Sequence, residues 1–471
     1  MNDSQAQKKP RMKKSTVVLR VLGYLKEHKA TLLLAALLAM ISNILALTAP
    51  SLSGRAIDAI VGKGQVKFNE VFLFSSLMLA CYAAAALLGF FLSLIMINLS
   101  RTVVYTMRKQ VFNHLSDLPV GYFDKNQTGD IISRLTYDID TINASLSNDV
   151  IQISTGIITV TGSLIMMFRY APVLMLIFAV TIPALIIFTR YRVKKVKPLF
   201  RARSAKLGEL NGYTEEMLSG QKTIKAYGRE EVMISRFEEH NEQAIDAYYK
   251  ADYQGSIVGP SVNFINNLSL SFISMFGAIL YLRNPAFTVG NLSSFVLYSR
   301  KFSGPINEAA NIISEIQSAT SAAERVFRLL DEVPEPKQSQ EDIVSDSTQG
   351  NIEIKNVNFG YSPNRLVLKD ISITIPRGST VAVVGPTGSG KTTIINLLMR
   401  FYDIESGEIR IDGSNTKDMT LDSVRASFSM VLQETWLFGG TIADNISYGV
   451  EKASRKNIIR AAKAAKIHDY I

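Results

Sequence analysis

A glycine-rich segment carries the clearest chemical signal in this sequence. Residues 381–400 read VAVVGPTGSGKTTIINLLMR, and the part GPTGSGKT fits the phosphate-binding pattern G-x-x-x-x-G-K-[ST]. Glycines let successive backbone N–H groups turn toward phosphate oxygens, and a helix that begins there adds its positive dipole end. Lys391 is expected to reach the β and γ phosphates of a nucleotide, and the hydroxyl of Thr392 is expected to bind Mg²⁺. The predicted nucleotide-binding residues are Gly385, Pro386, Thr387, Gly388, Ser389, Gly390, Lys391, Thr392 and Thr393.

Short strands around this segment predict an α/β domain that positions it. The stretches NIEIKNVNFGY and LKDISITI alternate apolar and polar residues, and VAVVG is continuously apolar, as suits a buried parallel strand. A helix should begin near Lys391, followed by short strands at GEIRIDG and SMVL. An empty glycine turn is the alternative interpretation. The position between a buried strand and an amphipathic helix favours a nucleotide site.

Long apolar runs before residue 315 predict a membrane domain. Crossing a hydrocarbon core of about 30 Å takes roughly 20 mostly apolar helical residues, and the runs at 31–47 and 71–97 are of this kind. Four further spans are predicted at 150–168, 172–188, 256–282 and 285–313. The charged stretches between the second and third spans and between the fourth and fifth are expected to continue as helices, because long structureless loops are uncommon.

Lysine and arginine are concentrated in the N-terminal segment and at 190–203, which predicts that these parts and both termini lie in the cytoplasm. The expected fold is a multidomain membrane protein. Its parts are a basic segment at 1–30, a six-span helical bundle with long cytoplasmic extensions at 31–333, a Pro-, Gln-, Ser- and Asp-rich linker at 334–350, and an incomplete α/β P-loop nucleotide-binding domain at 351–471.

The net charge of +10 is explained by these membrane-flanking segments, so no nucleic-acid partner is predicted. No aromatic residues alternate with the basic run to stack on bases. The single cysteine, Cys81, lies in an apolar run and excludes a disulfide framework or a thiolate metal site. The only metal expected is therefore the Mg²⁺ that accompanies a nucleotide.

With these features the chain resembles the ATP-binding cassette (ABC) exporters, in the half-transporter form. Tyr361, in FGYSPN, matches the aromatic residue that stacks on adenine in that family, and Gln433, in VLQETWLFGGTIADNI, matches the glutamine that contacts Mg²⁺ and the attacking water. Taken alone, Tyr361 could be a half-buried strand residue and Gln433 could end a strand. The spacing of Tyr361 to Gly385 and the residues after Gln433 favour the functional interpretation.

The resemblance extends to the segments that couple the two domains. LPVGYFDKNQTGDIISRLTYDID, at 118–140, resembles the first cytoplasmic loop of the family, whose coupling helix would include Tyr122 and Phe123. A second coupling helix would fall at KTIKAYGR and include Tyr227 and Gly228.

The resemblance also implies a function. It implies ATP-driven export by alternating access, with ATP and Mg²⁺ as cofactors and a second half-transporter, identical or related, as partner. Amphipathic drugs, lipids or peptides would be the substrates. The protein is expected to be a multi-pass protein of a bacterial plasma membrane.

The acidic residues that such an ATPase needs are missing from the sequence. Asp412 follows a run interrupted by Arg410, and Glu434 occupies the position next to the glutamine, so neither fits. The LSGGQ signature, the acidic strand, the catalytic glutamate and the switch histidine are absent, since the LSGQ at 218–221 lacks a glycine and precedes the P-loop. We therefore expect a C-terminally truncated sequence that does not hydrolyse ATP by itself. A non-hydrolysing regulatory subunit and a nucleotide-gated channel are the alternative functions.

Polar residues in the last two predicted spans suggest a substrate cavity. Asn263, Asn266 and Asn267 lie in the fifth span and Arg300 in the sixth, and intramembrane polar groups usually face a cavity or the bundle interior. Packing of helices through small polar residues is an equal alternative. Arg300 and Lys301 cannot point the same way on a helix, and both could instead extend to the membrane surface.

Overall fold

The computed structural model describes residues 12–60, 65–336, 348–362, 365–433, 435–450 and 452–471. The chain divides into two compact units, which are described separately. The helical unit comprises Met1–Ser116 and Thr128–Glu332, and the nucleotide unit comprises Asp117–Gln127 and Val333–Ile471. The first eleven residues of the predicted basic segment, and 337–347 of the predicted linker, lie outside the described residues.

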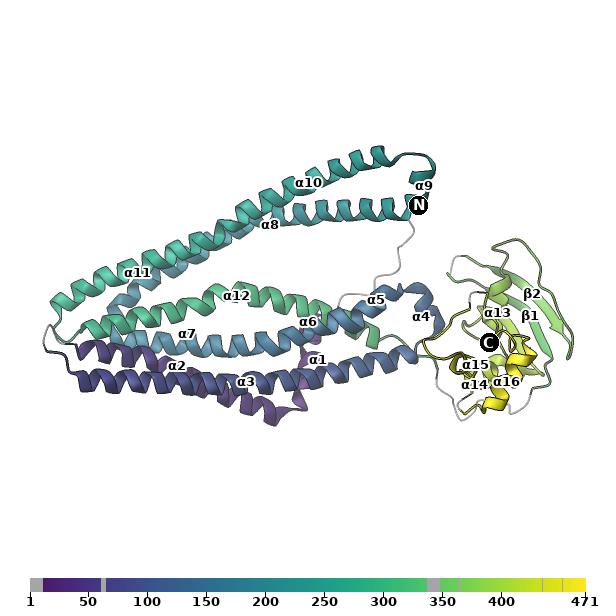
Figure 1. Cartoon of the computed structure of the whole chain (residues 1–471), viewed down its shortest axis with the longest axis horizontal. Coiled ribbons are helices and arrows are strands. Elements are labelled where there is room, and N and C mark those ends of the chain that lie inside the picture. The colour runs from purple at the N-terminus through teal and green to yellow at the C-terminus, as the bar shows by residue number, and fades with distance from the viewer. Residues whose placement is uncertain (1–11, 61–64, 337–347, 363–364, 434, 451) are drawn as a thin grey trace. The chain divides into compact units, whose positions relative to one another are not determined.

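The helical unit consists of long rods (Figure 1). Its helices are α1 (Lys14–Lys26), α2 (Lys29–Asp58), α3 (Phe68–Ser116), α5 (Thr128–Ser133), α6 (Ile139–Ala144), α7 (Val150–Tyr170), α8 (Met175–Ser219), α9 (Gln221–Ala226), α10 (Glu230–Ser256), α11 (Val258–Arg283) and α12 (Val289–Leu330). Two π-helical turns, η1 (Arg134–Asp138) and η2 (Ser145–Asp149), join α5, α6 and α7 into one rod, and a 3₁₀ turn, η3 (Pro172–Leu174), precedes α8. The helices continue well past the apolar runs, as predicted.

Five of these rods are long and apolar enough to cross a membrane: Lys29–Asp58, Phe68–Ser116, Thr128–Tyr170, Pro172–Ser219 and Glu230–Arg283. The sixth predicted span falls in α12, which has 42 residues but does not reach the same hydropathy. The helix packs against α2, α7 and α11, and it buries Phe295, Tyr298 and Phe302 among them. Only the face of a helix that packs on its neighbours has to be apolar, so the other faces of α12 can be polar.

Two clusters of side chains hold the rods together. One joins α2, α3, α6 and α12 through residues such as Ala39, Met107, Ile139 and Phe327. The other joins α7, α8, α11 and α12. Beyond these clusters α8 and α10 lie side by side as a hairpin (Figure 1), linked by an ion pair of 2.7 Å between Arg203 and Asp252.

The nucleotide unit contains a four-stranded antiparallel sheet in the order β2-β1-β3-β4. The strands are β1 (Ile352–Phe359), β2 (Leu368–Ile375), β3 (Ser406–Ile411) and β4 (Ser414–Asn415). Helix α13 (Lys391–Leu398) packs on the sheet, and Leu397 is buried with Ile354, Leu368 and Ile409. The unit also contains α4 (Val120–Lys125), η4 (Thr416–Asp418), α14 (Leu421–Ala426), α15 (Ile442–Ile446) and α16 (Arg455–Ala464).

The predictions of a buried strand at VAVVG and of a short strand at SMVL are wrong for this structure. Neither segment is a strand, and Val384 and Val431 are 87% and 91% exposed. A parallel strand is stable only between neighbours that pair with its backbone. In the described part of the chain neither segment has such a neighbour. The predicted strands at 351–361, 368–375 and 407–413 are confirmed, with antiparallel pairing.

Candidate nucleotide-binding site

The glycine-rich loop turns directly into the first residue of α13. Gly388 and Gly390 have φ angles of 85° and 92°, in the left-handed region that favours glycine. A Cβ atom on Gly390 would also come within 2.7 Å of a methyl group of Leu368. The loop therefore needs glycine at this position both for its conformation and for its contact with β2.

Lys391 closes the loop upon itself. Its Nζ atom donates hydrogen bonds to the carbonyl oxygens of Gly385 at 2.8 Å and Pro386 at 3.0 Å. Thr392 is exposed on the first turn of α13, whereas Thr393 is buried. The structure thus places a cation, an exposed hydroxyl and a helix N-terminus together, which is the set of groups that binds nucleotide phosphates and their metal ion.

Tyr361 lies beside the same helix. Its hydroxyl is 3.2 Å from the hydroxyl of Thr393 and accepts a longer hydrogen bond, 3.4 Å, from the side chain of Asn396. Its ring packs edge-on against Phe359 and Tyr402, with centroid distances of 5.0 and 5.1 Å. With 42% of the residue exposed, the ring remains accessible to a base, so the geometry is compatible with the predicted stacking role.

Gln433 lies in an exposed segment between α14 and α15, without helix or strand structure. Among the residues described here, no hydrogen bond to its side chain is formed. Its predicted role at Mg²⁺ stays a prediction. Glu434 lies outside the described residues.

Asp412 has a structural role, because its carboxylate binds three successive backbone amides. Its carboxylate accepts hydrogen bonds from the backbone amides of Gln349 at 2.6 Å, Gly350 at 3.3 Å and Asn351 at 2.9 Å. These bonds, that of Asn351 foremost, hold the pKa of Asp412 below its usual value. The residue caps the entry of the chain into β1, in agreement with the expectation that it is not the magnesium-binding acid.

The structure adds one contact that the sequence patterns did not indicate. The hydroxyl of Tyr402 donates a hydrogen bond to Asp124 of α4, and the Tyr402 ring lies against Gly121 of the same helix. Burial first, and then the neighbouring carboxylate, raise the pKa of Tyr402 above its usual value, so the hydroxyl remains a donor. The two residues are 278 positions apart, and no local pattern joins them.

Asp124, Tyr402, Tyr361 and Thr393 therefore form a continuous series of contacts from α4 to the helix of the glycine-rich loop. On α4, the predicted coupling residue Tyr122 is buried, and its ring packs edge-on against Phe123 at 5.6 Å.

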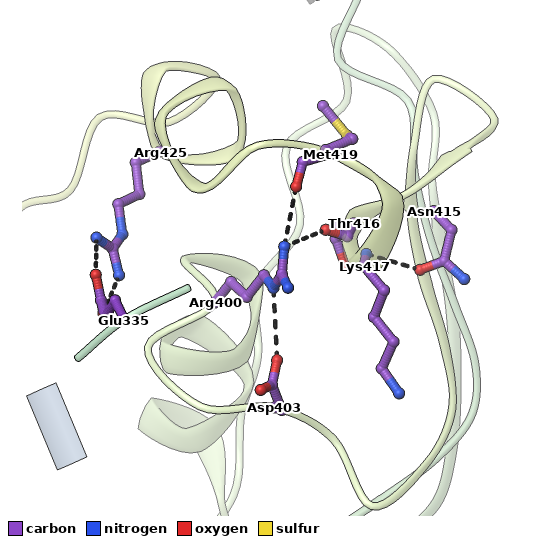
Figure 2. A network of polar contacts seen from close by, with 8 residues as sticks. All are labelled: Glu335, Arg400, Asp403, Asn415, Thr416, Lys417, Met419 and Arg425. Carbon is purple, nitrogen blue, oxygen red and sulfur yellow. Dashed lines mark hydrogen bonds and ion pairs between the residues drawn. The ribbon is translucent and has the colours of Figure 1, made fainter. Parts of the chain in front are cut away.

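Two arginines of the nucleotide unit, Arg400 and Arg425, form polar contacts with residues distant in the sequence (Figure 2). Arg400 donates to the carbonyl oxygens of Thr416 at 2.9 Å and Met419 at 3.0 Å. Arg425 forms a two-pronged ion pair with Glu335, at 2.7 and 2.8 Å. The backbone N–H of Glu335 also donates to the carbonyl of Asp117, three residues before α4, at 2.8 Å. Glu335 thus joins α14 to the segment that carries α4.

The other predicted residues are more dispersed. Tyr227 is 78% exposed and Gly228 has a φ of 59°, at the turn between α9 and α10. Asn266 lines a cavity of about 40 Å³ between α8, α11 and α12, whereas Asn263, Asn267 and Arg300 are exposed and do not line it.

Lys301, next to Arg300, points into the bundle. Its Nζ atom donates to the carbonyl of Ala46 at 2.9 Å. Pro50 of α2 has no N–H for that carbonyl, so the lysine satisfies an acceptor that the proline leaves free. The expectation that the two cations point in different directions is confirmed.

Comparison with known proteins gives the same division of the chain. A family model described as ABC transporter transmembrane region matches residues 32–306, and a second one, described as ABC transporter, matches residues 368–470. An uncharacterized ABC transporter ATP-binding protein of Bacillus subtilis is 38% identical over 453 residues, which cover 96% of this chain and 74% of that protein.

Two relatives carry substrate names. A fatty acid ABC transporter ATP-binding/permease protein of Mycobacterium tuberculosis is 38% identical over 88% of this chain and 65% of that protein. An ATP-dependent lipid A-core flippase of Pectobacterium atrosepticum is 34% identical over 81% of this chain and 66% of that protein. The chain spans about two thirds to three quarters of the length of these three relatives.

Proposed function

This chain belongs to the ABC transporter family, and from that premise we propose that it is the membrane and ATP-binding part of an exporter of hydrophobic or lipid-class molecules. It is a multi-pass membrane protein that joins a transmembrane region to an ATP-binding domain, as the resemblance implied. The observation that carries the proposal is the glycine-rich loop at the start of α13, in contact through Tyr361 and Tyr402 with α4. Through these contacts ATP binding would affect α4, the short helix between the rod of α3 and the rod that begins with α5.

In the proposed ATP site, Lys391 would exchange the carbonyls of Gly385 and Pro386 for the β and γ phosphates. Tyr361 would stack on the base, and Thr392 and Gln433 would hold Mg²⁺. Bound Mg²⁺ would neutralise charge that develops on the phosphates. The hydrogen bonds from Lys391 Nζ to two carbonyl groups of the loop support this role, because such loops bind phosphates.

We expect the hydrogen bond between Asp124 and Tyr402 to couple ATP hydrolysis to transport. Replacing Tyr402 by phenylalanine keeps the ring against Gly121 and Tyr361 but removes the donor. A hydrogen bond to a charged group is worth about 1.5–3 kcal/mol, so attachment of α4 should weaken. We predict ATP hydrolysis that continues in detergent, with transport per ATP reduced severalfold in reconstituted vesicles.

Tyr448 offers a matched control for that variant. It is an exposed tyrosine of the nucleotide unit whose ring stacks on Phe438, and among the described residues it forms no hydrogen bond with α4. Tyr448→Phe should leave the ratio of transport to hydrolysis unchanged. An unchanged ratio in Tyr402→Phe as well would show that the contact carries no coupling.

A second half-transporter is part of the proposal. The turn at Tyr227 and Gly228 projects from the α8–α10 hairpin, and α9 has no buried residue in the helical unit. Its exposure supports a role as a contact for the partner subunit, which is a second half-transporter, identical or related to this chain. Both termini would lie in the cytoplasm.

The class of substrate is proposed from the relatives and from the apolar interior of the bundle. The relatives named above handle fatty acids and lipid A-core, which favours a lipid-class molecule over a drug or a peptide. ATP-dependent relatives also favour export over the non-hydrolysing subunit.

Accumulation of a fluorescent lipid in inside-out vesicles tests the proposed export. We expect uptake against a gradient with ATP and none with a non-hydrolysable analogue. Passive flux that persists with the analogue would instead establish a nucleotide-gated channel. Nucleotide binding without either flux would establish a regulatory subunit.

A further inference from the structure

A polar cavity lies at the end of the helical bundle where α2 and α7 end and α12 begins. Its volume is about 460 Å³, and its polar lining includes Arg55 and Asp58 of α2, Arg169 and Tyr170 of α7, and Asn291 and Ser294 of α12. None of these residues belongs to the nucleotide unit or to the predicted substrate cavity. The cavity is therefore a separate feature of the helical unit.

The acidic residue of this cavity is already engaged. One carboxylate oxygen of Asp58 accepts a hydrogen bond from the Thr288 hydroxyl, and the other accepts one from the backbone N–H of Gly290, each at 2.7 Å. A carboxylate at the first turn of α12 is also favoured by the helix dipole. Asp58 thus binds groups at the start of α12. It does not pair with Arg55, which lies one helical turn away on α2.

The two arginines are left without an acidic partner. The guanidinium groups of Arg55 and Arg169 form no ion pair and no hydrogen bond with any residue that the structure describes. Tyr170 and Ser51 are paired with each other through their hydroxyl groups at 2.6 Å, and the Ser294 hydroxyl donates to the carbonyl of Pro50 at 3.0 Å. The free donors of the cavity are therefore the two guanidinium groups and the amide of Asn291.

The base of the cavity is preformed by a close helix crossing. A Cβ atom on Gly54 would overlap the carbonyl oxygen of Gly290, and a Cβ atom on Gly290 would overlap that of Gly54. Glycines at both positions let α2 and α12 approach at backbone contact, which fixes the spacing of the residues around them.

We propose that this cavity binds the anionic headgroup, a phosphate or a carboxylate, of a lipid-class molecule. Guanidinium groups form two-pronged hydrogen bonds with both of these anions. Basic pockets between membrane helices bind lipid headgroups while the acyl chains remain in the hydrocarbon. The inference rests on the proposed export function and gives it a headgroup site, at the end of the bundle away from the ends of α3 and α12 that lead to the nucleotide unit.

Binding of a fluorescent phosphatidic acid to the full protein in neutral phosphatidylcholine nanodiscs, without ATP, tests the inference. In the Arg55→Gln/Arg169→Gln double variant we expect binding to weaken about tenfold or more, because two charged contacts are lost. Arg55→Lys/Arg169→Lys should retain most of the binding. Arg283→Gln is the matched control, since Arg283 is an exposed arginine at the last position of α11, at the same end of the bundle, and does not line the cavity.

Each outcome has a defined meaning. Equal binding by the double glutamine variant, the control and the parent would overturn the inference. If the double variant fails to fold, the single variants Arg55→Gln and Arg169→Gln are compared with Arg283→Gln in the same way. Competition by inorganic phosphate would show that the free anion suffices, whereas binding that phosphate does not displace would show that the site requires the lipid.

The measurement is independent of export. Lys391→Ala should bind phosphatidic acid like the parent, because the nucleotide site is not involved. Lipid binding without ATP-driven export by the parent protein would contradict the proposed function alone, whereas export by the parent protein together with binding unaffected by the arginine variants would contradict the headgroup site alone.

Discussion

Replacing Lys391 by alanine in an assembled transporter that hydrolyses ATP should reduce hydrolysis at least about a hundredfold and abolish transport, while insertion into the membrane is unchanged. The loss of one positioned cation at a site of developing charge commonly costs this much. The lysine side chain reaches the loop carbonyls of Gly385 and Pro386, so it stands where phosphate oxygens would be bound. Phosphate release by the purified transporter in nanodiscs, together with lipid uptake by vesicles, measures both effects.

Lys369 provides the matched control for this prediction. It is an exposed lysine on β2 of the same unit, outside the glycine-rich loop. Lys369→Ala should hydrolyse ATP at the parental rate. A Lys391→Ala protein that still transported its substrate would contradict the proposed mechanism, whatever its rate of hydrolysis.

Introducing a side chain at Gly290 should destabilise the helical unit. An added Cβ atom would overlap the Gly54 carbonyl and the carboxylate of Asp58, and the Gly54 carbonyl is held in place by the backbone of α2. The crossing of α2 and α12 would have to open, at a cost typical of overpacking, about 1–3 kcal/mol or more. We expect Gly290→Ala, and Gly54→Ala for the same reason, to lower the apparent Tm of the protein in detergent by several degrees.

Gly304 provides the matched control for Gly290, because both glycines lie in α12. An added Cβ atom on Gly304, however, meets no atom within 4 Å. Since alanine is the better helix former, Gly304→Ala should leave the Tm unchanged or raise it slightly. Equal Tm values for Gly290→Ala and Gly304→Ala would show that the close crossing does not limit stability.

Much of the site was predictable because its signal is local. The spacing of the glycines, Lys391 and Thr392 is contained in eight consecutive residues, and the structure forms the predicted turn and helix there. Tyr361 was predicted from its distance along the chain to Gly385, and it lies beside Thr393 in the structure. Of the four residues predicted to line a substrate cavity, Asn266 lines the small cavity between α8, α11 and α12, and the substrate role of all four stays a prediction.

The strands show where local pattern fails. VAVVG has the composition of a buried strand, yet it forms none, because strand stability depends on neighbours that the pattern does not specify. By contrast, 351–361 and 368–375 pair with each other and become strands as predicted.

By itself the sequence determined the family, the membrane-spanning character of the helices and the nucleotide-binding loop, since each depends on residue types at short, regular spacings. Only the tertiary structure decided that Tyr402 bonds to Asp124, that Lys301 rather than Arg300 enters the bundle, and that Asp58 leaves Arg55 and Arg169 unpaired. These contacts join residues on different helices and strands. Which partner a side chain finds is set by the packing of whole elements, and that packing is not encoded in any short segment.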